Sequence, residues 1–93
     1  MTAISGQNAI AAAGTAEALG SQIINGPLMV KALDGNAGNV YVGNDGSGDV
    51  TSANGIVLAP GDAIVFEWVH ELSSIYLDAA NNDDGAAWLM LNV

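Results

Sequence analysis

Five Asx-Gly dipeptides constrain the fold of this chain more than any other feature of its sequence. The first four lie nine to eleven residues apart, and short apolar runs fill most of the gaps between them. Glycine reaches positive φ without strain, and Asn or Asp tolerates the left-handed region, so each dipeptide predicts a tight hairpin turn. Turn signals at this spacing predict an all-β sandwich or barrel. The dipeptides are Asn25-Gly26, Asp34-Gly35, Asp45-Gly46, Asn54-Gly55 and Asp84-Gly85.

Apolar and polar residues alternate between these turns, which predicts about eight short strands in a small β-sandwich or a jelly-roll-like barrel. The strongest predicted strand, Ala63–His70, is apolar on both faces, so we expect it to lie centrally in a sheet or under a neighbouring subunit. Its two faces are lined by Ile64, Phe66 and Trp68 and by Ala63, Val65 and Val69. The other predicted strands span residues 7–12, 15–19, 27–33, 39–43, 50–52, 56–58, 74–78 and 86–93.

Two segments carry further local signals. The first twenty residues are rich in alanine, and a short helix is the alternative to two strands that turn at Gly14, although a glycine in mid-helix costs about 1 kcal/mol. Later in the chain, Ala59-Pro60-Gly61-Asp62 predicts a turn, because Pro presets φ at its second position and Gly accepts positive φ at its third.

The length of 93 residues predicts a single domain over residues 1–93, with Met1–Gly6 as a candidate for an extended N-terminal arm. The start of the chain lacks a basic region and a long apolar core, so we expect no signal peptide and synthesis in the cytoplasm. The chain has no cysteine. A small domain without disulfides commonly gains stability through association.

The charge balance excludes two classes of partner. Ten acidic residues stand against a single basic one, Lys31. Nucleic acids and anionic membranes are both bound through clustered Lys and Arg, so neither is an expected partner. A basic protein surface or bound cations fit better, and the apolar half of the composition predicts surplus apolar surface in subunit contacts. Lys31 itself is expected to pair with an acid of its own chain or of a partner.

Few residues offer catalytic chemistry. His70 is the only histidine, and it could form a Ser-His-Asp arrangement only with Ser73 or Ser74, where nothing resembles a nucleophile elbow. The glycines occur in Asx-rich turns rather than in phosphate-binding loops between a strand and a helix. We therefore predict that the protein is not an enzyme and requires no cofactor.

Calcium binding is the weak candidate for a metal site. Asp45 and Asp49 alternate with Ser47 in a glycine-rich loop, but an EF-hand loop needs a bidentate Glu where Ile56 stands. A second acidic cluster contains Asp83 and Asp84. Asp and Asn in such loops more often bond to the backbone of their own turn, and we favour that interpretation.

The aromatic residues offer a binding surface or a core. Trp68 and Trp88 could stack on sugar rings, yet each has an apolar neighbour two residues away, Phe66 and Met90 respectively. This spacing favours packing, so these four residues are our candidates for core or interface anchors.

Segments along most of the chain resemble small bacteriophage virion proteins. The resemblance rests on turn-and-strand patterns rather than on a set of binding residues. It is carried by Gly14-Thr15-Ala16 with Leu19, Val30-Lys31-Ala32-Leu33, Gly38-Asn39-Val40-Tyr41-Val42-Gly43, Asn54-Gly55, Leu58-Ala59-Pro60-Gly61-Asp62, Leu72–Ala79 and Gly85-Ala86-Ala87-Trp88.

Proteins of this group are similar to β-sandwich or jelly-roll modules that assemble as oligomers, often trimers, on the phage particle. The resemblance implies a capsid decoration or cement protein on the capsid surface, whose partners are the major capsid protein or other virion proteins. The alternative is a tail, fibre or head-fibre component that binds carbohydrate or another host structure.

Overall fold

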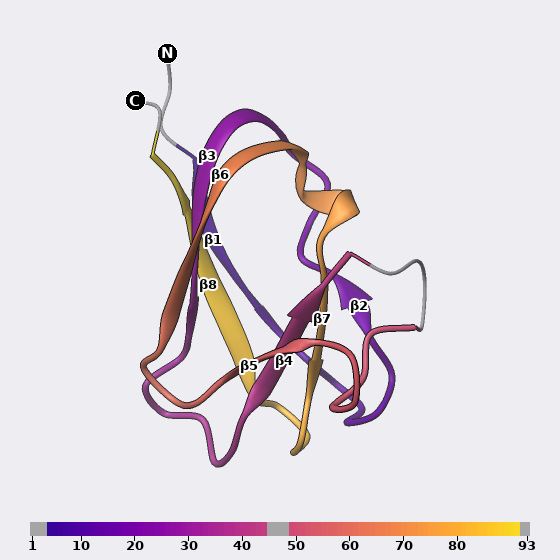
Figure 1. Ribbon diagram of the computed structural model, residues 1–93. Helices are drawn as coiled ribbons and strands as arrows, with labels where there is room; N and C mark the ends of the chain where they lie inside the picture. The colour runs from indigo at the N-terminus through magenta and orange to yellow at the C-terminus, as the bar shows by residue number, and fades with distance from the viewer. Residues whose placement is uncertain (1–3, 45–48, 92–93) are drawn as a thin grey trace.

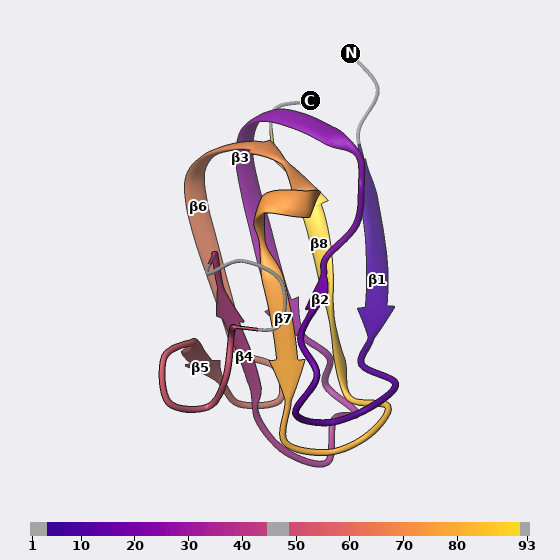
Figure 2. The same cartoon turned by 90° about the vertical axis from the view of Figure 1, so that its right-hand side faces the viewer.

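A computed structural model describes residues 4–44 and 49–91. Its eight strands form two antiparallel four-stranded sheets that pack face to face, which confirms the predicted all-β sandwich (Figures 1 and 2). A short 3-10 helix, η1, precedes β7. The elements are β1 (Ser5–Ala9), β2 (Glu17–Ala18), β3 (Ile23–Ala32), β4 (Val40–Gly43), β5 (Ile56–Leu58), β6 (Ala63–Glu71), η1 (Leu72–Ser74), β7 (Tyr76–Ala79) and β8 (Gly85–Met90).

The strand order is that of a jelly roll. The first sheet has the order β1-β8-β3-β6 and the second β2-β7-β4-β5. The antiparallel pairs β1–β8, β2–β7, β3–β6 and β4–β5 follow from one long ribbon doubled back on itself, and the pairs β3–β8 and β4–β7 join them into sheets. Strands β6 and β5 are therefore the edges on one side of the sandwich, and β1 and β2 are the edges on the other.

The core lies between the sheets and is built by alternation along the strands. Leu28, Val30 and Ala32 of β3 are fully buried, as are Val40 and Val42 of β4. Each buried side chain is followed by a more exposed one, which is the period of two that a half-buried strand requires. The alternation that predicts both strands in the sequence is thus present in the structure.

The N-terminal segment forms strands, not the alternative helix. The chain turns between β1 and β2, where Gly14 has φ of 90°. The two strands do not pair with each other, because β1 joins β8 in the first sheet and β2 joins β7 in the second. They are also shorter than predicted, at five and two residues.

The predicted turn at Asn25-Gly26 is wrong, because this dipeptide lies inside the ten-residue strand β3. Asn25 has φ of 48°, and the pairing of β3 with β6 shifts register between Ile23 and Gly26. The left-handed residue therefore forms a β-bulge rather than a hairpin. Pairing of Gly26 with Val69 of β6 holds the chain extended where the local signal favours reversal.

At the other described Asx-Gly sites the glycine has a different role from the predicted one. Gly14 and Gly61 are the glycines with positive φ in residues 4–44 and 49–91, so Gly35, Gly55 and Gly85 do not supply it. Gly61 confirms the predicted turn, in which Asp62 N–H donates to the Ala59 carbonyl at 2.9 Å. Asp45-Gly46 lies outside the described residues.

The predicted strand over residues 50–52 is absent, and β5 pairs with β4 instead. The Asn54 side chain closes this segment into a turn: its Oδ1 accepts the Thr51 N–H at 2.8 Å, and its Nδ2 donates to the Asp49 carbonyl at 2.7 Å. The Thr51 N–H and the Asp49 carbonyl, which would pair with a neighbouring strand in a sheet, are thus hydrogen-bonded within the turn.

Strand β6 is an edge strand, so its predicted central position is wrong. A second register shift, between Gly26 and Leu28 of β3, places an extra residue in β6 between Phe66 and Val69. The shift turns Val69 into the core and leaves Trp68 exposed, whereas strict alternation placed Trp68 beside Phe66. Whether a neighbouring subunit covers β6 stays a prediction.

Candidate functional site

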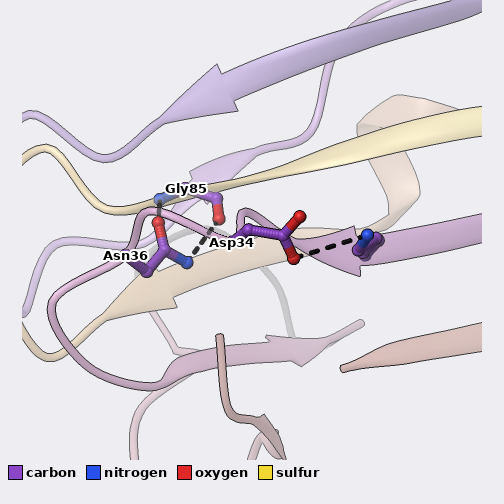
Figure 3. Close-up of polar contacts among 4 residues, drawn as sticks. Asp34, Asn36 and Gly85 are labelled. Carbon is purple, nitrogen blue, oxygen red and sulfur yellow. Dashed lines mark hydrogen bonds and ion pairs between the residues drawn. The ribbon is translucent and has the colours of Figure 1, made fainter. Parts of the chain in front are cut away.

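The polar side chains at one end of the sandwich bond to backbone groups. Loops 10–16, 33–39 and 80–84 gather at the lower end in Figure 1. There the Asn36 side chain pairs with Gly85 at two points, its Nδ2 donating to the carbonyl at 2.8 Å and its Oδ1 accepting the N–H at 3.0 Å (Figure 3). This pairing ties the 33–39 loop to the start of β8.

Two buried carboxylates bond to neighbouring loops in the same way. Asp84 accepts the N–H groups of Ala37 and Gly38, one on each oxygen and both at 2.9 Å. Asp78 accepts the Gly14 N–H at 2.9 Å. Only 5% of Asp84 and 3% of Asp78 is exposed, so these hydrogen bonds compensate the loss of water around each carboxylate.

The calcium candidates are spread over different connections. Both oxygens of Asp84 already accept backbone N–H groups, and the neighbouring Asp83 is exposed at φ of 71°. Asp49 is exposed beside the Asn54 turn, and Asp45 lies outside the described residues. Among residues 4–44 and 49–91, no group of three or more His, Cys, Asp and Glu side chains is placed to hold a metal ion. Among the described candidates, the carboxylate of Asp84 is engaged by backbone N–H groups of the 33–39 loop.

Three of the four aromatic and apolar candidates lie in or against the core. Met90 and Trp88 are 2% and 8% exposed, and the half-buried Phe66 packs against the same cluster. The Trp88 ring lies against Gly6 of β1, where a Cβ atom would approach its Cζ2 to 2.6 Å. Its Nε1 is buried without a hydrogen-bond partner in the described structure. Trp88 and Met90 are thus core residues and are not available to a partner.

Trp68 is the exposed member of the four candidates. It is 60% exposed, and its ring lies nearly parallel to that of His70, with 6.1 Å between centroids and 14° between planes. His70 Nδ1 lies 2.7 Å from Asn25 Oδ1. An amide oxygen only accepts, so Nδ1–H donates, and the bulge residue Asn25 orients the imidazole. Within the described contacts, Asn25 is the hydrogen-bond partner of His70, and neither Ser73 nor Ser74 is.

A groove opens between the two sheets at the β5–β6 side of the sandwich. It has a volume of about 550 Å³ and is lined by residues of β4, β5 and β6 and of the segment that leads into β7. Ile56 of β5, which lines the groove, is 50% exposed, and so is the next residue, Val57. The apolar part of the lining includes Val42, Ile56, Phe66, Trp68, Val69 and Ile75.

The outward face of the first sheet, here called the outer face, is unusually apolar. The register places Met29 of β3 between Val65 of β6 and Leu89 of β8, so these residues form a continuous apolar row across three strands. Val65 is 55% exposed and Leu89 38%. Trp68 and Leu91, which is 40% exposed and donates its N–H to the Pro27 carbonyl, extend the surface beyond the row.

Sequence reasoning missed this row. Alternation along the last strand carried the signal, because Leu89 lies between Trp88 and Met90 and must point away from the core if both are buried. Alternation along the predicted strand 27–33 likewise places Met29 opposite Leu28 and Val30, but it does not show that Met29 belongs to a surface. Only the pairing of three strands shows that residues 29, 65 and 89 are neighbours.

Lys31 lies on the outer face, two residues along β3 from Met29 of the row. Its Nζ is 3.4 Å from Asp34 Oδ1, and the two side chains are 42% and 78% exposed. An exposed ion pair of this kind contributes roughly 0–1 kcal/mol. The expectation that Lys31 pairs with an acid of its own chain is therefore confirmed, and the pair is weak enough to exchange.

No protein-family model matches this chain, and no match is found among curated proteins. Among its described residues, no helix has the length and apolar character needed to span a bilayer.

Proposed function

We propose that this chain is a bacteriophage virion structural protein, a capsid decoration or cement protein that binds the assembled shell as an oligomer. The observation that supports it most is the presence of two apolar surfaces on one small acidic domain. One is the outer face, with the row Met29, Val65 and Leu89. The other is the groove, where Ile56 of β5 is half exposed.

Two such surfaces suit a module with two kinds of contact. Monomeric proteins seldom expose extended apolar patches, and larger ones mark interaction sites. One surface serves contacts between copies, and the other serves contacts with the shell. Jelly rolls occur in viral capsid proteins, and this analogy of fold adds to the sequence resemblance, although a fold alone does not define a function.

The mechanism would be thermodynamic. A module that binds the assembled shell but not its separated subunits stabilises the shell by mass action. Several copies joined together gain avidity, because the second contact becomes intramolecular. The net charge of −9 favours a shell surface that is less acidic than the module.

The test is a binding and stability assay on heads from the encoding phage that lack this protein. We expect the added protein to co-sediment with the heads in hundreds of copies per particle and to raise their disruption temperature. Ile56→Asp should reduce this binding, whereas Asp83→Asn, a change on an exposed loop, should not. A handful of copies at one vertex would indicate a tail or fibre component instead, and no binding to any virion part would refute the proposal.

A further inference from the structure

The acids of this chain avoid the outer face. Ten acidic residues occur in the sequence. Among those that the structure describes, one lies at an outward strand position of the first sheet, Glu67 on β6. The other described acids lie in turns, on the second sheet or at the end of β6. Two copies that each carry a net charge of −9 repel each other, so they approach most readily through the face that bears the fewest carboxylates.

The two charged side chains at outward strand positions, Lys31 and Glu67, lie on opposite sides of the apolar row. Met29 pairs with Val65, and the two strands are antiparallel. Lys31 is two residues beyond Met29 on β3, and Glu67 is two residues beyond Val65 on β6, so they point to opposite sides of the row. Each lies about 7 Å from it along its strand.

From this arrangement we infer that the outer face binds the outer face of a second copy about a two-fold axis. The axis lies in the interface along the row, so Met29 and Val65 of each copy meet their counterparts. Rotation about this axis reverses the strand direction, so Lys31 of each copy lies opposite Glu67 of the other copy. The two residues are offset sideways by about one strand spacing, 4.8 Å. The face is thus self-complementary in apolar character and in charge.

The intramolecular pair between Lys31 and Asp34 does not oppose this contact. Both side chains are substantially exposed, so the ammonium group can be shared between Asp34 and Glu67 of the second copy. A two-fold contact of this kind builds pairs. The trimer implied by the sequence resemblance would require a different surface for each side of the contact.

Charge reversal with rescue, followed by sedimentation equilibrium, tests the inference. Lys31→Glu and Glu67→Lys should each weaken the dimer about tenfold, because two ion pairs per dimer become like-charge contacts. The double variant Lys31→Glu/Glu67→Lys restores both pairs with the signs exchanged and should recover most of the lost affinity. Leu89→Asp should leave the protein monomeric, since it places two carboxylates in the apolar row.

Two control variants separate this contact from other causes. Asp34→Asn removes the intramolecular partner of Lys31 and should not weaken the dimer. Asp49→Lys changes the charge by the same amount as Glu67→Lys but on a loop away from the face, and it should not weaken the dimer either. Circular dichroism and melting curves of every variant check that the fold is kept.

Three results would overturn the inference: a monomer at every accessible concentration, a trimer, or a dimer whose affinity the double variant does not recover. The inference does not depend on a place in a phage particle. A dimer that fails to bind any virion part would refute the proposed function alone, and a monomer that decorates heads would refute the two-fold contact alone.

Discussion

Single Asx residues hold this fold together by replacing backbone partners that the loops lack. Asp84, Asp78 and Asn36 each bond to backbone groups of a loop more than forty positions away in sequence. A buried N–H group without an acceptor costs free energy comparable to a lost hydrogen bond. These residues are therefore structural links between the strand ends, which accounts for much of the acidic and amide content of the loops.

Replacing Asp84 with Ala should lower the free energy of unfolding by about 2–3 kcal/mol, because the N–H groups of Ala37 and Gly38 lose their acceptor. Urea unfolding measured by circular dichroism gives this value. Asp34→Ala is the matched control, since it removes an exposed carboxylate whose ion pair contributes at most about 1 kcal/mol. Equal losses in both variants would contradict the structural role of Asp84.

Gly85→Ala should destabilise the protein by about 3 kcal/mol or more, because a Cβ atom there would overlap the backbone of Asn8 and Ala9 on β1. Gly35→Ala is the control: a Cβ at that position meets nothing within 4 Å, and the residue lacks positive φ. This control should be neutral or stabilising by up to about 1 kcal/mol. Thermal melting of both variants decides the matter, and an unchanged Gly85→Ala melt would show that β1 does not pair this closely with β8.

Among the strands, β3 and β6 carry the irregularities that shape the exposed surface. The bulge at Asn25 and the extra residue between Phe66 and Val69 lie in the same strand pair. Together they turn Val69 inward, leave Trp68 exposed and bring His70 to Asn25. Bulges commonly redirect a side chain in this way.

The positive φ of Asn25 makes the bulge testable by two substitutions. Asn25→Gly and Asn25→Ala both remove the hydrogen bond to His70, so the difference between them reports on the backbone. Asn25→Ala should be the less stable by about 1–2 kcal/mol, because a Cβ disfavours the left-handed region. In a regular strand Ala would be favoured over Gly, so the opposite order in chemical denaturation would show that this residue is extended.

For the molecule as a whole, the dominant electrostatic term is repulsion among its own acids. The net charge of −9 on 93 residues destabilises the compact state, and salt screens that repulsion. A partner that binds at the apolar row or at the groove would bury exposed apolar surface area. Stability, association and ionic strength are therefore coupled in this protein.

Raising sodium chloride from 10 mM to 300 mM should raise the melting temperature by about 4–8 °C, which corresponds to roughly 1 kcal/mol of screened repulsion. Calorimetry at a fixed protein concentration measures this shift, and a concentration series at each salt level separates it from any change in association. Asp49→Asn/Asp83→Asn reduces the net charge from −9 to −7 at two exposed positions, so its shift should be smaller. A melting temperature that falls with salt would contradict this account.

The sequence alone determined the fold class, the alternation along β3 and β4, and the turn at Ala59–Asp62. These features depend on neighbours within a few positions, where alternation and the φ preferences of Pro and Gly act directly. It also identified Phe66, Trp88 and Met90 as core or interface candidates, and the structure places them in or against the core.

The tertiary structure decided which Asx-Gly dipeptides reverse the chain and which side chains face outward. Asn25-Gly26 became a bulge because pairing with β6 holds it extended, a condition that no local signal encodes. One extra residue in β6 then exchanged the faces of Trp68 and Val69, since a slip of one position inverts a strand. The row of Met29, Val65 and Leu89 exists only because three distant segments pair in that register.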